Sequence, residues 1–359
     1  MKHRNPKINK YYMIFPEDDL LTRWKKRLTR RPIPTFPRNI QIQTQTGCNA
    51  DCIFCPYGAT ADGQPKGKMD WSLFRRIVDE SARYRVRRIS PYLMNEPFVD
   101  REIFERIRYI NQANPRAKVI ITTNGSLLTP PVVDQLLNLG DGLHEIYVSF
   151  QGIDPKAYEE TMRGGLKFDR TLANVDHLIE EMRRRKTIRP ALWITMVDTT
   201  VIDARKAVTY WRGRGVNSKY TMLENRGGNI KDAESFSHSQ VMSYFSTCTR
   251  LFKQAYIKFD GDVVLCCTDY ETRVVLGNVR ERSLYDVWNG PVATEIRRKF
   301  LSDRIGEISL CSVCKVDEEK EVEVRAPRPL TMTPPRPTAS RPMASASSSV
   351  TPPAPPSLN

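Results

Sequence analysis

The sequence predicts an α/β fold: an open parallel sheet of repeated strand–helix units, followed by a small cysteine-containing C-terminal domain. From residue 40 onward, short apolar runs alternate with segments of helical periodicity, the pattern of repeated βα units. Residues 225–247 are polar and loop-like, and residues 248–320 hold five of the eight cysteines. A chain of 359 residues can hold one large domain and one small one.

The individual elements follow from these patterns. Strands are expected at 40–46, 88–94, 118–123, 145–150, 191–197 and 219–224, and helices at 70–83, 101–112, 131–139, 168–184 and 203–214. In the first helix the apolar residues Trp71, Phe74 and Ile77 have helical spacing, and Asp70 is placed to cap it. Active residues of parallel barrels sit at the carboxyl ends of strands, so functional residues are sought there.

The two ends of the chain differ from its centre. Residues 1–38 form a basic, proline-containing N-terminal extension with one short helix expected around 20–28. Residues 322–359 hold ten of the 25 prolines and are expected to be a disordered tail, because such a segment cannot bury enough apolar surface to fold. Between them we expect the barrel at 39–230 and the second domain at 231–321.

The charge distribution limits the classes of partner. Residues 1–39 carry eleven Lys/Arg and three acids, and residues 324–359 carry four arginines and no acid, so only +3 of the net +15 remains between them. A basic excess confined to the ends makes nucleic acid an improbable substrate. No apolar run approaches the roughly 20 residues that span a bilayer, and no signal peptide is apparent. We therefore expect a cytoplasmic protein without membrane contact, whose cysteines are ligands rather than disulfides.

Three cysteines directly after the first expected strand are the central motif. Cys48, Cys52 and Cys55 read C-x3-C-x2-C, so a short loop can aim three thiolates at one point. Three ligands of one kind suit an iron–sulfur cluster with one open iron better than a closed four-ligand zinc site. A zinc loop with a distant fourth ligand, or three unrelated thiols, are the alternatives.

This stretch resembles the signature of the radical S-adenosylmethionine (SAM) enzymes. The resemblance covers roughly residues 38–318 and implies a partial (βα)6 TIM-like barrel. It implies that the three cysteines hold a [4Fe-4S] cluster whose fourth iron is bound by the amino and carboxylate groups of SAM. The aromatic residue before the third cysteine, here Phe54, is expected beside the adenine.

The same resemblance assigns further SAM contacts. Glu96, in Glu96-Pro97 after the second strand, stands where the family has a Gly-Gly-Glu-Pro-like motif that meets the SAM amino group, although the two glycines are absent. Asn124 and Ser149, after the third and fourth strands, are expected to bind the ribose and the methionine carboxylate. Arg163 is the candidate arginine for that carboxylate, since a guanidinium fork matches its geometry.

A second cysteine set lies near the C-terminus. Its proposed ligands are Cys248, Cys266, Cys311 and Cys314. The segment 257–265 reads as a hairpin with an Asp-Gly turn that presents Cys266, although Cys267 could replace it. The spacing resembles the SPASM/twitch auxiliary-cluster domain, in the truncated twitch form because no cysteine follows Cys314. It implies a second [4Fe-4S] cluster; a structural zinc is the alternative.

The resemblance implies a redox enzyme that cleaves SAM to a 5′-deoxyadenosyl radical and abstracts a substrate hydrogen. An auxiliary cluster with four cysteines favours electron transfer and net two-electron oxidation, with a small polyol or amino sugar as the first substrate class. A flavodoxin- or ferredoxin-type protein is the expected electron donor. The candidates for substrate acid/base chemistry are the strand-end residues Asp198, Glu224 and Arg226.

Two other readings remain open at this point. Radical maturation of a ribosomally made peptide uses the same chemistry, but the extension is too short to be a peptide-binding winged-helix domain. The alternative from a different functional class is a non-catalytic, metal-stabilised scaffold protein.

Overall fold

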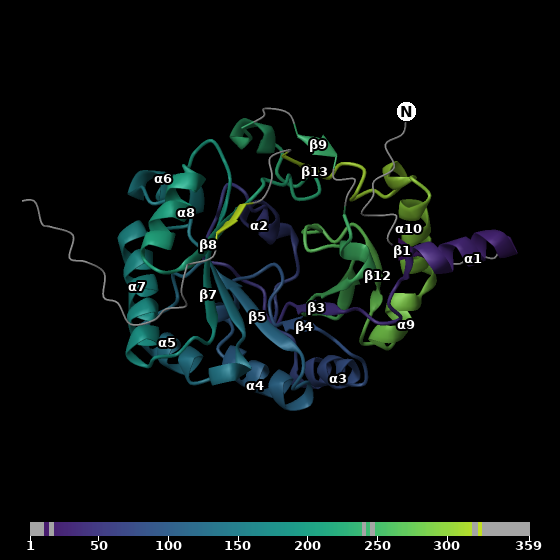
Figure 1. Ribbon diagram of the computed structural model, residues 1–359, viewed down its shortest axis with the longest axis horizontal. Helices are drawn as coiled ribbons and strands as arrows, with labels where there is room; N and C mark the ends of the chain where they lie inside the picture. The colour runs from purple at the N-terminus through teal and green to yellow at the C-terminus, as the bar shows by residue number, and fades with distance from the viewer. Residues whose placement is uncertain (1–10, 14–17, 239–241, 245–247, 318–321, 325–359) are drawn as a thin grey trace, which may run out of the picture.

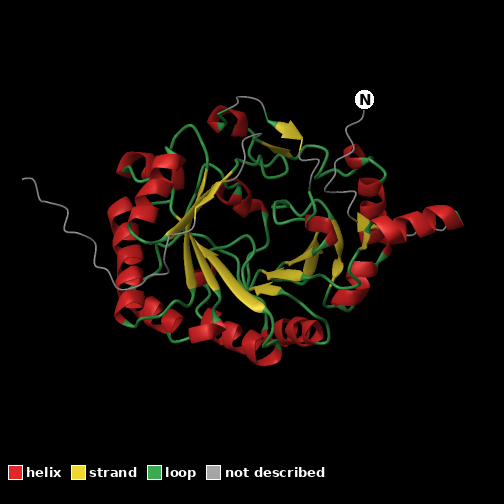
Figure 2. Ribbon diagram, in the orientation of Figure 1, coloured by secondary structure: helices red, strands yellow, loops and turns green. Residues whose placement is uncertain are grey.

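The computed structural model describes residues 11–13, 18–238, 242–244, 248–317 and 322–324. Within this part of the chain, one curved ten-stranded sheet runs in the order β12-β11-β10-β3-β4-β5-β6-β7-β8-β14. Figure 2 shows this sheet bent around the centre of the molecule, with helices on its outer side. No described helix is long and apolar enough to cross a membrane.

Six parallel strands form the barrel, as predicted. They are β3 (Asn39–Ile42), β4 (Arg88–Ser90), β5 (Lys118–Thr123), β6 (Glu145–Ser149), β7 (Ala191–Val197) and β8 (Asn217–Thr221). β4 is shorter than the expected 88–94 because Pro91 follows it and has no N–H to donate to a ladder. β8 begins two residues before the expected 219–224 and ends three residues earlier.

The helices cover the outer face of these strands (Figure 1). They are α3 (Trp71–Ala82), α4 (Ile103–Ala113), α5 (Pro130–Leu137), α6 (Pro155–Met162), α7 (Phe168–Arg184) and α8 (Ala204–Gly213). Asp70 caps α3 as expected, accepting a 2.8 Å hydrogen bond from the Leu73 N–H. Helix α6 was not expected from the sequence; it begins at Pro155 and is capped by Asp154.

Burial alternates along the barrel strands. In β6, Ile146 and Val148 are fully buried, whereas Tyr147 and Ser149 are only partly buried. The buried set packs beneath the helices, and the alternate set lines the inner cavity described below. The barrel therefore has an apolar outer layer and an inner face that carries polar side chains.

The C-terminal domain extends the same sheet. β10 (Gln254–Ile257) pairs parallel to β3, and β11 (Asp262–Val264) and β12 (Val275–Asn278) continue from it as antiparallel strands. The turn between β10 and β11 contains Gly261 at φ +99°, so the predicted Asp-Gly hairpin is present. Helices α9 (Leu284–Asn289) and α10 (Pro291–Leu301) complete the domain.

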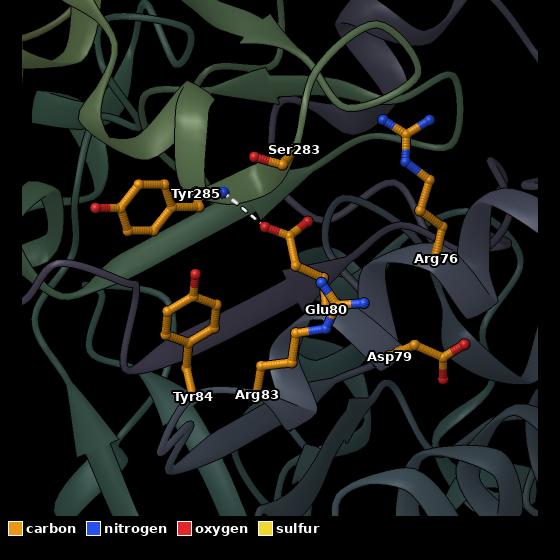
Figure 3. A pocket seen from close by; sticks show the side chains of 7 residues that line it. All are labelled: Arg76, Asp79, Glu80, Arg83, Tyr84, Ser283 and Tyr285. Carbon is orange, nitrogen blue, oxygen red and sulfur yellow. Dashed lines mark hydrogen bonds between the residues drawn. The ribbon is translucent and has the colours of Figure 1, made fainter.

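A seam of hydrogen bonds joins α3 to the start of α9, and Figure 3 shows the bond between Glu80 and Tyr285. The Glu80 carboxylate accepts from the backbone N–H groups of Leu284 and Tyr285, both at 2.8 Å. Arg76 donates to the backbone carbonyls of Arg280 and Arg282 on the same side of the seam. Because one barrel helix holds the other domain at several backbone groups, the two cysteine-bearing parts keep a defined relative position.

The described part of the extension is also anchored. The predicted helix is α1 (Leu20–Thr29), and β1 (Tyr11–Tyr12) pairs with β2 (Arg31–Pro32). Beyond it, the Trp288 indole N–H donates to the Pro34 carbonyl at 2.8 Å, so the extension ends against the C-terminal domain.

One boundary needs correction. Residues 322–324, expected to open the disordered tail, form β14 (Val322–Val324), which pairs antiparallel with β8. The free edge of β8 offers backbone groups that a passing extended segment can satisfy, whatever its composition. The remaining tail, 325–359, lies outside the described residues. Two short strands, β9 (Ser243–Tyr244) and β13 (Lys315–Val316), form a separate pair.

Candidate functional site

A cavity of about 470 Å³ lies at the carboxyl ends of the parallel strands and extends into the barrel. The predicted residues among its lining are Cys48, Cys52, Phe54, Cys55, Glu96, Asn124, Ser149 and Arg226. Cys267 and Tyr270 enter the lining from the C-terminal domain. The cavity thus brings together residues that the sequence spreads over more than 200 positions.

The loop that carries the first three cysteines is anchored to neighbouring strand ends. The Glu96 N–H donates to the Gly47 carbonyl at 2.9 Å. The Asn49 side chain donates to Ser126 Oγ and accepts from the Asn124 amide, both at 2.8 Å. Asn124, predicted as a SAM contact, therefore also positions the cysteine loop.

The end of α6 supports the loop from another side. The N–H groups of Asp51 and Ile53 donate to the carbonyls of Met162 and Thr161, at 3.2 and 3.0 Å. Gly164 follows at φ +64°, and a Cβ there would lie 2.8 Å from backbone atoms of residues 49–51. Only glycine allows this close approach, so the unpredicted helix α6 fixes the shape of the cysteine loop.

The three thiols suit a cationic cofactor. Burial raises the pKa of Cys48 to about 12 and that of Cys52 well above its usual value. The pKa of each is raised further by the negative charge that other cysteines of the set would carry. Deprotonation of such a group needs compensating positive charge, which the iron atoms of a cluster supply. The donor set and its anchored loop therefore fit the predicted cluster.

Glu96 is buried at the edge of this cavity. Its carboxylate accepts from Thr123 Oγ1 at 2.6 Å and from the Asn124 N–H at 2.8 Å. Burial raises the pKa of Glu96 to about 7, although these hydrogen bonds oppose the shift. A carboxylate with this environment gains strongly from a cationic partner, such as an ammonium group.

The four predicted C-terminal ligands lie within electrostatic reach of one another. The pKa of Cys311 is raised chiefly by burial and then by the charges of Cys266, Cys248 and Cys314. The neighbouring Cys267 thiol, together with the Arg250 guanidinium, lowers the pKa of Cys266 despite its burial. Cys266 packs against the same apolar cluster as Cys248 and Cys311, whereas Cys267 lines the central cavity.

Among the described residues, no three Cys, His, Asp or Glu side chains converge tightly enough to hold one metal ion. The positions of the side chains alone therefore do not identify the group that each cysteine set holds.

The central cavity is not lined by three of the predicted residues: Arg163, Asp198 and Glu224. Arg163 is exposed and lines a separate cavity on the outer side of the cysteine loop, so the structure does not place it with Glu96 and Ser149. α6 ends at Met162 and turns the Arg163 backbone to φ +49°, which removes its side chain from the barrel interior. Asp198 pairs with His238 at 3.2 Å and lines another cavity with it.

Glu224 does not line the central cavity but lies behind it. It pairs with Arg250 at 2.5 Å and with Arg226 at 3.5 Å. Burial would raise the pKa of Glu224, but the two arginines outweigh it and lower the pKa. A carboxylate held in its charged form by two guanidiniums is a poor proton acceptor. Its partner Arg226 does line the cavity.

Arg88, Tyr147, Lys219 and Tyr270 are among the cavity residues that the sequence did not indicate as functional. The first three lie at inward-facing positions of strands. The alternation of polar and apolar residues along those strands could have indicated them in the sequence. Nothing in the sequence indicates Tyr270, because its position depends on how the C-terminal domain packs against the cysteine loop.

Residues 42–221, half of the chain, match the Radical SAM superfamily, and residues 248–315 match SPASM, an iron–sulfur cluster-binding domain. The chain belongs to the radical SAM superfamily. Its cofactors are accordingly [4Fe-4S] clusters and SAM, so the zinc alternatives for the two cysteine sets no longer apply. The chain is a radical SAM family enzyme, not a non-catalytic scaffold.

One curated relative and two solved structures match this chain over most of its length. The S-adenosyl-L-methionine-dependent 2-deoxy-scyllo-inosamine dehydrogenase of Niallia circulans is 23% identical over 276 residues, covering 77% of this chain and 91% of the relative. A crystal structure of BtrN in complex with AdoMet and 2-DOIA has a TM-score of 0.56 at 20% identity, covering 78% of this chain and 93% of that one. Streptococcus suis SuiB bound to precursor peptide SuiA has a TM-score of 0.58 at 18% identity, covering 80% and 74%.

Proposed function

We propose that the chain is a two-cluster radical SAM oxidoreductase that acts on a small polyhydroxylated substrate inside its barrel. The observation that carries the proposal is the shared cavity, which is lined by Cys48, Cys52 and Cys55 and also by the Cys267–Tyr270 loop that follows Cys266. A substrate in this cavity lies between the two cysteine sets. Both sets can therefore take part in one reaction.

The residues of the cavity have separate roles in this proposal. Cys48, Cys52 and Cys55 hold the first cluster, and Phe54, Asn124 and Ser149 bind SAM beside it. Glu96 pairs with the SAM amino group, because its buried carboxylate gains a cation there. When bound, these cofactors supply a 5′-deoxyadenosyl radical that removes a hydrogen atom from a substrate carbon.

The second cluster takes the role of electron acceptor. Cys248, Cys266, Cys311 and Cys314 provide four ligands, so no iron is left open for substrate. Arg250 lies beside Cys266, with its Nη1 4.0 Å from the sulfur, and Thr268 donates to that sulfur at 3.3 Å. Hydrogen bonds to ligand sulfurs favour the reduced form of a cluster. This environment supports net two-electron oxidation of the substrate.

We infer the substrate class from the dehydrogenase of Niallia circulans, whose name describes action on an aminocyclitol. The inward-facing Thr122, Thr195 and Thr221 line the cavity and offer hydroxyl groups to a polyol. Peptide maturation is the second candidate, since SuiB bound to its precursor peptide has the same fold.

In this proposal the electron donor approaches the first cluster from outside the barrel. Cys52 and Cys55 also line the outer cavity of about 610 Å³ that contains Arg163. A flavodoxin- or ferredoxin-type protein docked there would be close to the first cluster without entering the substrate cavity.

Anaerobic reconstitution followed by an iron count and a 5′-deoxyadenosine assay tests the proposal. We expect about eight irons per chain and 5′-deoxyadenosine formation with SAM and a strong reductant. The triple variant C48A/C52A/C55A should keep about half the iron and form no 5′-deoxyadenosine. Tightly bound zinc, or an intact first cluster that does not cleave SAM, would contradict the proposal.

A further inference from the structure

Three charged side chains form a connected group that reaches both cysteine sets. At its centre, the Glu224 carboxylate pairs with the Arg250 guanidinium at 2.5 Å and with the Arg226 guanidinium at 3.5 Å. Arg250 donates through both terminal nitrogens, one to each carboxylate oxygen, which is the strong bidentate geometry. The Glu224 side chain is only 13% exposed, so solvent screens its charge little. We call Arg226, Glu224 and Arg250 the charge bridge.

One end of the charge bridge meets the second cysteine set. The Arg250 Nη1 lies 4.0 Å from the Cys266 sulfur, and the same nitrogen donates to Glu224 at 3.2 Å. Burial alone would lower the pKa of Arg250, but the negative charges around it, Cys267 and Glu224 foremost, raise it. Arg250 therefore holds a positive charge beside a proposed ligand of the second cluster.

The other end of the charge bridge meets the first cysteine set. Arg226 lines the central cavity together with Cys55 and Tyr270, whose hydroxyl lies 3.4 Å from the Cys55 sulfur. Burial alone would lower the pKa of Arg226, but nearby negative charge, chiefly that of Glu224, raises it. Ionised Tyr270, Cys267 and Cys55 add to this effect. Arg226 is therefore within electrostatic range of a ligand of the first cluster.

The backbone of Arg226 has an unusual conformation that its neighbours maintain. Its φ of +50° lies in the left-handed region, which residues with a Cβ rarely adopt. The preceding Asn225 side chain donates to the Val313 carbonyl and accepts from the Lys315 N–H, both at 2.8 Å. Val313 and Lys315 flank Cys314, so the loop of the charge bridge is tied to the second cysteine set. Strained backbone held in this way is typical of functional sites.

A charge near a cluster changes its reduction potential, because the reduced form carries one more negative charge than the oxidised form. We propose that the charge bridge sets the reduction potentials of both clusters: Arg226 raises that of the first, Arg250 raises that of the second, and Glu224 lowers both. All three are positioning residues, since they act through the clusters. The inference rests on the proposed function, in which the second cluster accepts an electron, and Arg250 makes it a better acceptor.

E224Q is the central test, because glutamine keeps the shape of glutamate and removes its charge. Both clusters should become easier to reduce. At a fixed applied potential, the ratio of reduced to oxidised cluster should rise at least about threefold, or roughly 28 mV for one electron. Potentiometric titration of the reconstituted full chain, followed by electron paramagnetic resonance, measures this. SAM binds the first cluster alone, so the signal that changes on adding SAM belongs to that cluster.

The two arginines should separate the clusters, and they test the inference independently of E224Q. R226Q should lower the potential chiefly of the first cluster and R250Q chiefly that of the second, each by a ratio of at least about threefold. The charge-conserving R226K and R250K should retain most of the potential. R250Q should also raise the ratio of 5′-deoxyadenosine to product, because its second cluster accepts an electron less readily. Iron counts and circular dichroism establish that each variant is folded and loaded.

Helix α7 offers a matched control. Glu181 pairs with Arg184 at 2.7 Å and with Arg185 at 3.3 Å, so it is also a carboxylate held by two guanidiniums. It does not line the central cavity. E181Q and R184Q should leave both cluster potentials unchanged.

Two results would overturn the inference: an E224Q variant in which either potential is unchanged or lowered, or arginine variants that shift both clusters equally. A purely structural role would move the potentials in the same direction in all three variants, whereas the charge bridge predicts opposite signs for E224Q and the arginine variants. Product formation in C248A/C311A tests the proposed function separately. Full product there refutes the electron-acceptor role alone, and loss of product there with unchanged potentials in E224Q refutes this inference alone.

Discussion

The Tyr270 hydroxyl lies 3.4 Å from the Sγ of Cys55. Tyr270 belongs to the C-terminal domain and lies four residues after Cys266, whereas Cys55 belongs to the N-terminal cysteine loop. When Cys55 binds iron as a thiolate, the phenol is the donor of this hydrogen bond. One side chain thus links the loop of the second cysteine set to a ligand of the first.

Replacing Tyr270 by Phe should lower the reduction potential of the first cluster. The reduced cluster places more negative charge on its sulfur ligands, so the donated hydrogen bond stabilises the reduced form. Its loss should cost about 1 kcal/mol, or roughly 40 mV for one electron. A potentiometric titration followed by electron paramagnetic resonance measures the shift. Y109F, which loses a hydrogen bond to Asp79 outside the cavity, is the control; equal potentials in Y270F and wild type would refute the link.

SAM affinity should rise with pH up to about 7. Below this value the raised pKa of Glu96 leaves its side chain protonated and neutral, so it cannot pair with the SAM ammonium group. Each pH unit below 7 should weaken binding by up to about tenfold, and SAM binding should release a proton. Equilibrium binding between pH 5.5 and about 8 measures the dependence. E96Q should bind weakly with little dependence over this range, while E105Q, at an exposed helix position, should behave as wild type.

Removal of two C-terminal ligands should separate the clusters. In C248A/C311A the second cluster is lost, so about half the iron should remain. SAM cleavage should continue without coupled product formation, because the first cysteine set is intact. Iron analysis and the ratio of 5′-deoxyadenosine to product measure this. Full product formation would show that the second cluster is not the electron acceptor.

The choice between Cys266 and Cys267 has its own test. Cys266 packs in one cluster with Cys248 and Cys311, and Cys267 lines the cavity, so C266A should lose the second cluster and C267A should retain it. Iron counts and absorption spectra of the two variants decide the assignment. A cluster that survives in C266A but not in C267A would reverse it.

Gly164→Ala should impair the first cluster selectively. The added Cβ would lie 2.8 Å from the backbone of residues 49–51, and the positive φ adds strain. We expect the variant to reconstitute with a lower iron content in the first cluster while the second cluster fills normally. G213A is the control, because a Cβ at Gly213 in α8 meets no atom within 4 Å and alanine favours the helix. Equal iron contents in both variants would show that the loop tolerates displacement.

The sequence alone was sufficient to predict the order of the barrel elements. Apolar runs and helical periodicity are local patterns, so the six parallel strands and their five predicted helices appear near the expected positions. The C-x3-C-x2-C spacing is equally local, because three ligands within eight residues must share one loop. For the same reason the Asp-Gly hairpin before Cys266 was predictable.

The tertiary structure decided which residues share the cavity. It excluded Arg163 and Asp198, because helix ends and loop turns aim their side chains elsewhere. It added Tyr270, because β10 pairs with β3 and carries the second cysteine set to the mouth of the barrel. It also joined Arg88 to Lys219, which lie 131 positions apart, because closure of the sheet turns both toward one lumen. Contacts of this kind depend on packing between distant segments, which local sequence patterns do not encode.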